Sequence, residues 1–372
     1  MAGVRSSLTR IRAAIVKEML SLLRDPKGRI VLVVPPLLQL LLFSYATTLD
    51  VKNADIGILN LSQGRTSAEL VQRLDGSPRF RHLVPLHSPG EVQQAMENQK
   101  VIAALVLTSD FDAQAARGET ARAGLILDGR RSNAAQIVGT YVAQIVGGMG
   151  AELSPMASRA GGTVITNWYN PSRDYMWFTI PALVGMIVAV AGLAITGQMV
   201  SREREMGTFD QLMVSPLRVH EILIGKMAPP FIIGLFNGTI FLILGQLLFG
   251  VPFTGSVLLF YVALAFYLLS LIGVGIFISS LSMTQQQSFL GVFLVMTPIM
   301  LLSGYASPID NMPGWLQLLT YANPMRYFMI AMQGLFLKAM PFSILWPQLW
   351  PLIIIAFITL SASAWLFRAS ME

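Results

Sequence analysis

The sequence predicts an α-helical polytopic membrane protein with six transmembrane helices, re-entrant helices and an inserted small mixed α/β extracytoplasmic domain. Three observations support this class. Hydrophobic residues make up 54% of the 372-residue chain and charged residues only 12%, whereas about a quarter of the residues in soluble domains are charged. The apolar residues gather in six runs without Asp, Glu, Lys, Arg or His, and each run approaches or exceeds the roughly 20 residues that cross a bilayer. A long segment of ordinary charge separates the first two runs.

The first 28 residues predict an amphipathic helix that lies in the membrane surface on the cytoplasmic side. Its apolar residues recur at spacings of three and four, while basic residues occupy the other faces. These apolar residues are Leu8, Ile11, Ile15, Met19 and Leu22. Pro26 and Gly28 break this helix and allow a sharp turn into the first span. A plain cytoplasmic helix is the alternative interpretation.

The apolar runs give the positions of the six spans. We expect them at residues 29–49, 175–200, 226–251, 256–281, 287–305 and 346–367. If the N-terminus is cytoplasmic, the short segments on that side carry twelve Lys and Arg residues, and those on the other side carry only Arg326 and Lys338. Because basic residues concentrate in short cytoplasmic segments, both ends of the chain and residues 201–217 are predicted to be cytoplasmic.

Residues 50–174 predict a small mixed α/β domain on the opposite side of the membrane. Short apolar runs alternate there with helical patterns, which is typical of strands and helices in one domain. A longer helix is expected next, because Ile137, Tyr141, Ile145 and Met149 repeat every four residues. Gly161 and Gly162 then mark a linker back to the membrane.

Residues 306–340 predict a re-entrant helical hairpin that forms a gate. The segment is too apolar for a free loop and too interrupted by prolines for one helix. The predicted gate residues are Pro308, Pro313, Asn323, Pro324 and Arg326. A re-entrant pair is tolerated at membrane depth only where it packs against protein or faces water. An external pair of interfacial helices is the alternative.

Residues 201–216 place dense mixed charge between two spans. Arg202, Glu203, Arg204 and Glu205 are followed closely by Phe209 and Leu212, so a helix here presents an apolar stripe and a charged face. This pattern favours docking onto a soluble partner. The alternative is a face on which the charges pair only within the segment.

Several kinds of chemistry are missing from the sequence. The nearest approach to a phosphate-binding loop, Gly225-Lys226, lacks the upstream glycine spacing and the Ser or Thr that such loops need. There is no cysteine, and the three histidines, His82, His87 and His220, show no metal-ligand spacing. We therefore expect no catalytic residue, no metal site and no cofactor bound directly. The basic residues form no cluster of the kind that binds nucleic acid.

Uncharged polar residues remain within the spans. They are Gln39, Gln198, Asn237 and Gln246. Each is either a hydrogen-bonding contact between helices or a polar residue that lines a path through the membrane. Proton relays in membranes need ionisable groups, and none of the six apolar runs contains one. Proton-coupled transport and membrane-embedded catalysis are therefore disfavoured.

Four short motifs, taken in order on this topology, resemble the permease subunit of a bacterial ABC exporter of the type-2 class, in the branch with a large external domain after the first span. They are Arg24-Asp25-Pro26, Trp168-Tyr169-Asn170-Pro171, the run from Glu203 to Thr208 with Gln211-Leu212 and Ser215-Pro216, and the prolines Pro308 and Pro313 with Asn323-Pro324. The similarity covers essentially the whole chain. Asp210 and Met213 are small departures from the family pattern, and neither changes the expected docking.

The resemblance implies a multi-pass protein of the bacterial inner membrane that works with separate cytoplasmic ATPase subunits. Two ATPases would bind ATP and Mg, and a second permease subunit, identical or paralogous, would complete the path for an amphipathic small molecule, drug or lipid. A periplasmic adaptor protein and membrane lipids are further candidate partners. The implied coupling helix comprises Arg202, Glu203, Arg204, Glu205, Gly207, Thr208, Phe209, Gln211, Leu212 and Pro216.

A membrane-anchored sensor with a periplasmic ligand-binding domain is the alternative function. It explains the external domain but gives six spans and a re-entrant segment no role. A membrane enzyme is disfavoured because no cluster of ionisable residues is present to carry the reaction.

Overall fold

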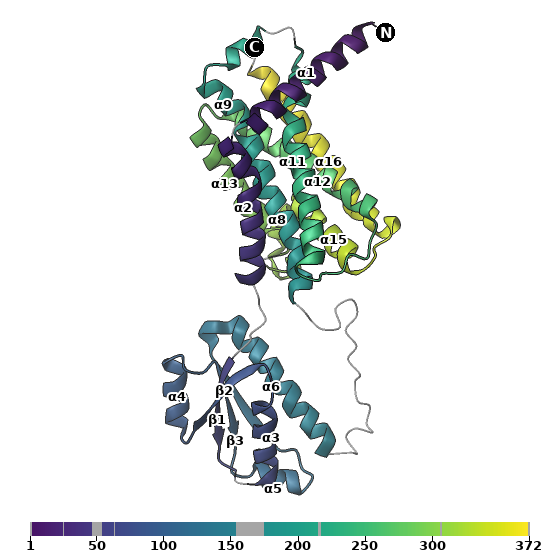
Figure 1. Cartoon of the computed structure of the whole chain (residues 1–372). Coiled ribbons are helices and arrows are strands. Elements are labelled where there is room, and N and C mark those ends of the chain that lie inside the picture. The colour runs from purple at the N-terminus through teal and green to yellow at the C-terminus, as the bar shows by residue number, and fades with distance from the viewer. Residues whose placement is uncertain are drawn as a thin grey trace. The chain divides into compact units, whose positions relative to one another are not determined.

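The computed structural model describes residues 2–24, 26–46, 54–62, 64–153, 175–214, 217–305 and 307–370. The chain divides into two compact units (Figure 1). One is helical and is made of residues 1–47 with 168–372, and the other is an α/β unit made of residues 48–167. Each unit has its own buried apolar core. Trp168 to Pro171 and the predicted linker at Gly161 and Gly162 lie outside the described residues.

The α/β unit contains a four-stranded sheet of order β2-β1-β3-β4. Its strands are β1 (Ala54–Asn60), β2 (Phe80–Leu86), β3 (Ala103–Leu107) and β4 (Ala123–Leu127). β1 pairs in parallel with both β2 and β3, and β4 runs antiparallel to β3. β1 is central and its residues are mostly buried, as expected for a parallel strand covered on both faces.

Helices cover both faces of this sheet (Figure 1). Their bounds are α3 (Arg65–Asp75), α4 (Pro89–Glu97), α5 (Phe111–Ala116), the 3₁₀ turn η1 (Gly129–Arg131) and α6 (Ser132–Leu153). Leu70 of α3, Phe111 of α5 and Val138 of α6 are buried in one core, and Val92 of α4 is buried in the other. The segment predicted to be mixed α/β thus forms a small sheet between two layers of helices.

The helical unit is built around α12 (Val257–Leu281). Its other membrane-length or apolar helices are α2 (Pro26–Ala46), α8 (Tyr175–Gly197), α11 (Val219–Leu247), α13 (Gln285–Leu301) and α16 (Phe342–Ala369). Its remaining elements are α1 (Ala2–Arg24), α9 (Met199–Glu205), α10 (Phe209–Met213), η2 (Ile309–Asn311), α14 (Gly314–Thr320) and α15 (Pro324–Leu337). Gly234 and Gly238 of α11 lie directly against Leu268 and Leu264 of α12, so the absence of side chains lets these two helices approach closely.

Among the described residues, four helices are long and apolar enough to cross a membrane. They are α8 together with α9, then α11, α12 and α16. α13 has 17 residues and is therefore about 25 Å long at 1.5 Å per residue, shorter than the roughly 30 Å hydrocarbon core. In α2, the apolar stretch found is Val34–Ser44. The protein is polytopic, while the spans expected at residues 29–49 and 287–305 stay predictions.

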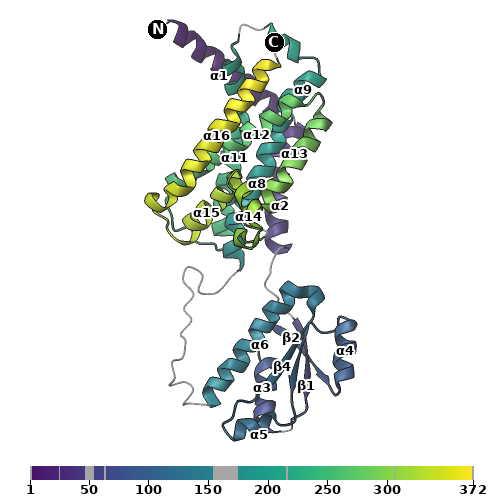
Figure 2. The ribbon, with the colours of Figure 1, turned by 180° about the vertical axis from the view of Figure 1, so that it is seen from behind.

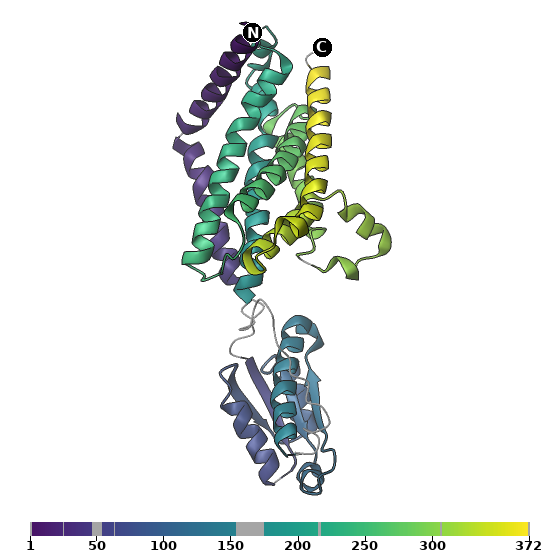
Figure 3. The same ribbon diagram turned by 90° about the vertical axis from the view of Figure 1, so that its right-hand side faces the viewer.

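The two ends of the helical unit are formed by different elements. The start of α1, helix α9 and the end of α16 lie at one end (Figures 1 and 2). α15 lies toward the other end, where Phe328, Met332 and Phe336 are fully buried. α14 and η2 stand out from one side of the unit (Figure 3), and Trp315 and Leu318 of α14 are largely exposed. The expected helical pair in residues 306–340 is therefore made of one buried and one exposed helix.

Candidate functional site

The charged segment after α8 forms two short helices joined by a tight turn. α9 ends at Glu205, and Gly207 then adopts a φ of +68°, a conformation that glycine tolerates and other residues avoid. The Thr208 amide donates a hydrogen bond to the Glu203 carbonyl at 2.9 Å, which closes the turn before α10 begins. The single coupling helix expected over residues 201–217 is therefore divided in two. Pro216 and the Leu212 side chain lie outside what the structure describes.

Contacts from α12 and α16 hold this segment in place. The amides of Val200 and Ser201 both donate to Ser279 Oγ at 3.0 Å. Phe209 is buried and packs edge-on against Phe367, with their ring centroids 6.0 Å apart. The apolar side chain that the sequence analysis assigned to docking thus anchors α10 to its own protein.

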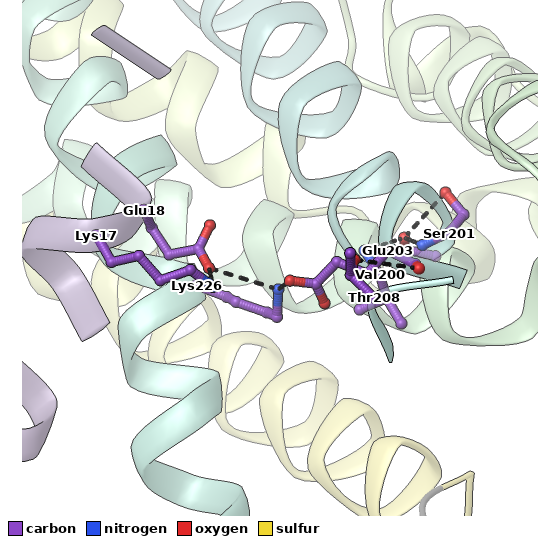
Figure 4. A network of polar contacts seen from close by, with 8 residues as sticks. Lys17, Glu18, Val200, Ser201, Glu203, Thr208 and Lys226 are labelled. Atoms are coloured by element: carbon purple, nitrogen blue, oxygen red, sulfur yellow. Dashed lines mark hydrogen bonds and ion pairs between the residues drawn. The ribbon is translucent and has the colours of Figure 1, made fainter. Parts of the chain in front are cut away.

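Lys226 of α11 lies at the centre of a buried ionic cluster (Figure 4). Its Nζ lies 2.6 Å from Glu203 Oε1 of α9 and 3.9 Å from Glu18 Oε1 of α1. The Lys226 side chain is 2% exposed, and the two glutamates are 16% and 19% exposed. A buried ammonium needs such opposite charges because its hydration is lost. One lysine therefore joins three separate helices.

The next two residues of α9 contact two further helix ends. Arg204 Nη1 donates to the carbonyls of Ser280 and Ser282, at 2.8 and 3.1 Å, where α12 ends. Glu205 Oε2 accepts from the main-chain amide of Gln285 at 2.8 Å, where α13 begins. A cation at a helix C-terminus and an anion at a helix N-terminus both complement the helix dipole. Residues 203–205, named here the inner triplet, thus contact α11, α12 and α13 in turn.

The N-terminal helix α1 is fixed to the first two turns of α11. Glu221 is fully buried and accepts hydrogen bonds from Ser7 Oγ at 2.5 Å and from the Arg218 amide at 3.0 Å. Arg10 of α1 pairs with the same carboxylate at 3.2 Å. One turn further along α11, Gly225 lies against Ala14, and a Cβ there would come within 2.8 Å of the alanine methyl group.

Sequence reasoning missed Glu221 and Lys226. Apart from His220, they are the ionisable residues of a helix that is otherwise uncharged over residues 219–247, and that isolation is the signal that they need partners. The partners could not be identified from the sequence, because Ser7 and Glu221 are 214 residues apart.

The rest of the charged segment faces outward. Glu205 is exposed while it holds α13; the other exposed residues of the segment, named here the outer face, are Arg202, Met206, Gly207, Asp210, Gln211 and Val214. Met206 is 62% exposed and Val214 is 86% exposed. The predicted docking residues that the structure describes therefore separate into two groups: the inner triplet, Phe209 and half-buried Thr208 bind neighbouring parts of the protein through their side chains, and Arg202, Gly207 and Gln211 are exposed.

A cavity of about 280 Å³ lies between α2, α8 and α13. Apolar side chains, including three methionines and three phenylalanines, form most of its wall. The lining residues are Gln39, Phe43, Met186, Ile187, Val190, Ala194, Phe289, Val292, Phe293, Met296 and Met300. Of the four predicted pathway residues, Gln39 lines this cavity. Asn237 is buried elsewhere in α11, Gln198 precedes α9, and Gln246 is exposed.

The predicted gate residues stand at the starts of short helices. Pro308 and Pro313 directly precede η2 and α14, and Pro324 is the first residue of α15. Asn323 caps α15 by accepting from the Met325 amide at 3.0 Å, and it donates to the Ile299 carbonyl of α13 at 2.8 Å. Arg326 donates to Thr320 and lies 4.1 Å from the centre of the Tyr321 ring. Within the described ranges, no group of His, Cys, Asp and Glu could hold a metal ion.

Four apolar helices of membrane length, an apolar cavity between α2, α8 and α13, and a charged segment held at one end of the helical unit indicate a polytopic transport protein. The family model for ABC-2 family transporter proteins matches residues 29–365. The chain therefore belongs to the ABC-2 transporter family.

Curated relatives support the same assignment. The chain is 44% identical over 361 residues to the probable multidrug ABC transporter permease YbhR of Escherichia coli K12, covering 96% of this chain and 98% of that one. It is 32% identical over 340 residues to the probable multidrug ABC transporter permease YbhS of the same organism, covering 89% of each chain. The inner membrane transport permease YhhJ is 31% identical over 197 residues, or 52% of each chain. The protein is a membrane permease subunit of an ABC exporter.

Proposed function

We propose that this subunit forms, with a second permease subunit, the path by which an amphipathic small molecule, drug or lipid is exported, and that a separate cytoplasmic ATPase docks on the outer face. The division of the charged segment into an inner triplet and an outer face carries this proposal. A segment that was merely a solvated loop would not need three consecutive charged side chains bound to three different helices.

The outer face has the chemistry of a protein-binding surface. Met206 and Val214 are exposed apolar side chains, and Arg202 and Asp210 add charges of both signs. Charges beside an apolar contact set the specificity and register of docking more than its affinity. ATP and Mg would be bound by the ATPase, because the chain has no phosphate-binding loop of its own.

The cavity between α2, α8 and α13 supports a path for amphipathic molecules. An apolar cavity with one polar group, Gln39, suits a ligand that is largely apolar with a polar end. Methionine side chains adapt to ligands of different shape, which fits the multidrug names of two relatives.

The proposed topology is that of a bacterial inner-membrane protein with six spans and both termini in the cytoplasm. Helix α9, the start of α1 and the end of α16 lie at the same end of the helical unit (Figure 2). The basic residues of the short segments concentrate at the same end, as the distribution of Lys and Arg in membrane proteins requires of the cytoplasmic side. The α/β unit would then be periplasmic, where an adaptor protein could bind it.

The alternative function as a sensor has less support from the α/β unit. Open parallel sheets bind ligands beyond the carboxyl ends of the strands where the strand order reverses, here beside β1 and β3. At this point the Asp112 carboxylate accepts hydrogen bonds from the amides of Gly64 and Ser67, both at 2.9 Å, and from Ser62. The protein's own carboxylate thus occupies the N-terminus of α3, where an anionic ligand would bind.

Co-purification with the ATPase tests the proposed function. We expect Met206→Asp combined with Val214→Asp to abolish co-purification and ATPase stimulation, because both substitutions place charge in the apolar part of the interface. Lys100→Glu, an exposed substitution in the α/β unit, is the control and should have no effect. Undiminished binding of the ATPase to the double variant would refute docking on the outer face.

A further inference from the structure

The inner triplet is directly connected to two of the three helices that line the cavity. Glu205 is bound to the first residue of α13, and α13 contributes five of the cavity residues. α9 follows α8 along the chain with one residue between them, and α8 contributes four more. The third wall, α2, makes no direct contact with the inner triplet that the structure describes.

α2 packs directly on α8, and a second connection reaches it from the inner triplet through Lys226 and α1. Lys226 holds Glu203 of α9 on one side and Glu18 of α1 on the other (Figure 4). α1 is fixed to α11 at two more places, by Glu221 with Ser7 and Arg10, and by Gly225 against Ala14. α2 begins two residues after α1 ends, so a displacement of α1 must move the start of α2.

We infer that Lys226 and Glu205 are positioning residues that pass movement of the docked segment to separate walls of the cavity: Lys226 to the α2 wall through α1, and Glu205 to the α13 wall. The α8 wall moves with the segment through the main chain. This inference rests on the proposed function, since the movement comes from the ATPase.

The Lys226 contacts must be strong enough to transmit displacement to α1, whereas Glu205, which is exposed, holds α13 through a main-chain hydrogen bond at 2.8 Å. The Lys226 ammonium is almost fully buried, so water does not screen its contact with Glu203, and a pair in such surroundings is much stronger than an exposed pair. Lys17 Nζ lies 3.5 Å from Glu18 Oε1, but the Lys17 side chain is 65% exposed. An exposed pair of this kind contributes little, and Lys17 is therefore a matched control.

Thiol accessibility at each wall tests the inference in the complete complex with the ATPase in lipid. Because the chain has no cysteine, one introduced cysteine is its sole thiol. Phe43→Cys reports on α2, Val190→Cys on α8 and Phe293→Cys on α13. The measurement is the rate of modification by N-ethylmaleimide in the nucleotide-free complex and in the complex trapped with ATP and vanadate, with the permease band resolved on a gel.

In the otherwise unmodified chain we expect all three rates to change several-fold between the two states. Lys226→Met should remove the change at Phe43→Cys and leave it at Val190→Cys and Phe293→Cys. Glu205→Ala should remove it at Phe293→Cys and leave it at the other two positions, so each variant controls for the other. Lys17→Met and the charge-conserving Lys226→Arg should leave all three changes in place.

The outcomes separate this inference from the proposed function. A full nucleotide response at Phe43→Cys in the Lys226→Met chain, or equal loss at all three walls, would overturn the inference alone. No response at any wall of the unsubstituted complex would overturn the proposed function as well. If Lys226→Met does not assemble with the ATPase, Glu18→Gln takes its place, because it removes only the charge of α1 that contacts Lys226. If Phe43→Cys kept its full nucleotide response in the Glu18→Gln chain, the inference would equally be overturned.

Discussion

At the scale of single residues, each unit contains buried or half-buried charges that are bound by partners distant in sequence, among them Asp112, Glu221 and Lys226. Asp112 is the clearest case in the α/β unit. Burial raises the pKa of its carboxyl, but hydrogen bonds from Ser62, Ser67 and the Gly64 amide outweigh that effect and hold the pKa well below its ordinary value. The ionised carboxylate therefore stabilises the junction between β1 and α3.

We predict that Asp112→Ala destabilises the α/β unit by about 3 kcal/mol, since hydrogen bonds to charged groups contribute about 1.5–3 kcal/mol each and are partly redundant. A carboxyl with a lowered folded pKa stabilises the fold above its unfolded pKa of about 3.9, and this contribution is lost as pH falls through the folded pKa. Amide hydrogen exchange of residues 64–75 in the full-length protein measures both effects.

The control for this prediction is Asp110→Ala, at an exposed carboxylate directly before α5. It should change exchange little at pH 7. If Asp112→Ala left the exchange rates at neutral pH unchanged, or if the variant retained the whole acid dependence of the natural chain between pH 6 and pH 3, the stabilising role of the Asp112 carboxylate would be wrong.

At the scale of helices and strands, the sequence predicted the apolar helices and the mixed α/β segment because both depend on patterns within one element. It could not predict the burial of Glu221 or Lys226, which depends on α1 lying against α11. It also interpreted residues 201–217 as one helix, because a helix there would present an apolar stripe and a charged face. The conformation of Gly207, at φ +68°, ends α9 instead.

The contact between α1 and α11 gives a prediction at this scale. We expect Gly225→Leu to detach α1, because even a Cβ at this position would approach the Ala14 methyl group within 2.8 Å. Trypsin should then cleave after Arg10 or Arg12 several times faster than in the natural chain. Gly147→Leu is the control, since nothing lies within 4 Å of a Cβ at that helical glycine. Equal cleavage of the Gly225→Leu and natural chains would contradict a close α1–α11 contact.

At the scale of the whole molecule, the Lys and Arg distribution and the arrangement of helix ends both support the proposed orientation, with the two termini in the cytoplasm. The family assignment adds that the chain is part of an exporter. The sequence could identify candidate membrane residues such as Gln39 and Asn237, but it could not tell which of them line a cavity. That distinction depends on how α2, α8 and α13 are arranged around a common space.

Orientation in the membrane is directly testable because the natural chain has no cysteine. We predict that a membrane-impermeant maleimide added to intact cells with a permeabilised outer membrane labels Lys338→Cys and Glu119→Cys but not Gln211→Cys. Lysed cells should label all three. Labelling of Gln211→Cys in intact cells would place the outer face on the wrong side for an ATPase.

The shortness of α13 has a consequence for the surrounding lipid. We propose that α13 crosses the bilayer. A helix about 25 Å long would then create hydrophobic mismatch with the thicker hydrocarbon core, and local thinning of the bilayer would relieve it. This thinning would occur beside the exposed side chains of Phe293 and Leu294, on a helix that also borders the cavity, so lipid tails there would be less ordered and an amphipathic molecule could leave the leaflet more easily. Turnover in vesicles should therefore rise as acyl chains are shortened toward the length of α13, and a rate independent of chain length would show that mismatch has no part in substrate access.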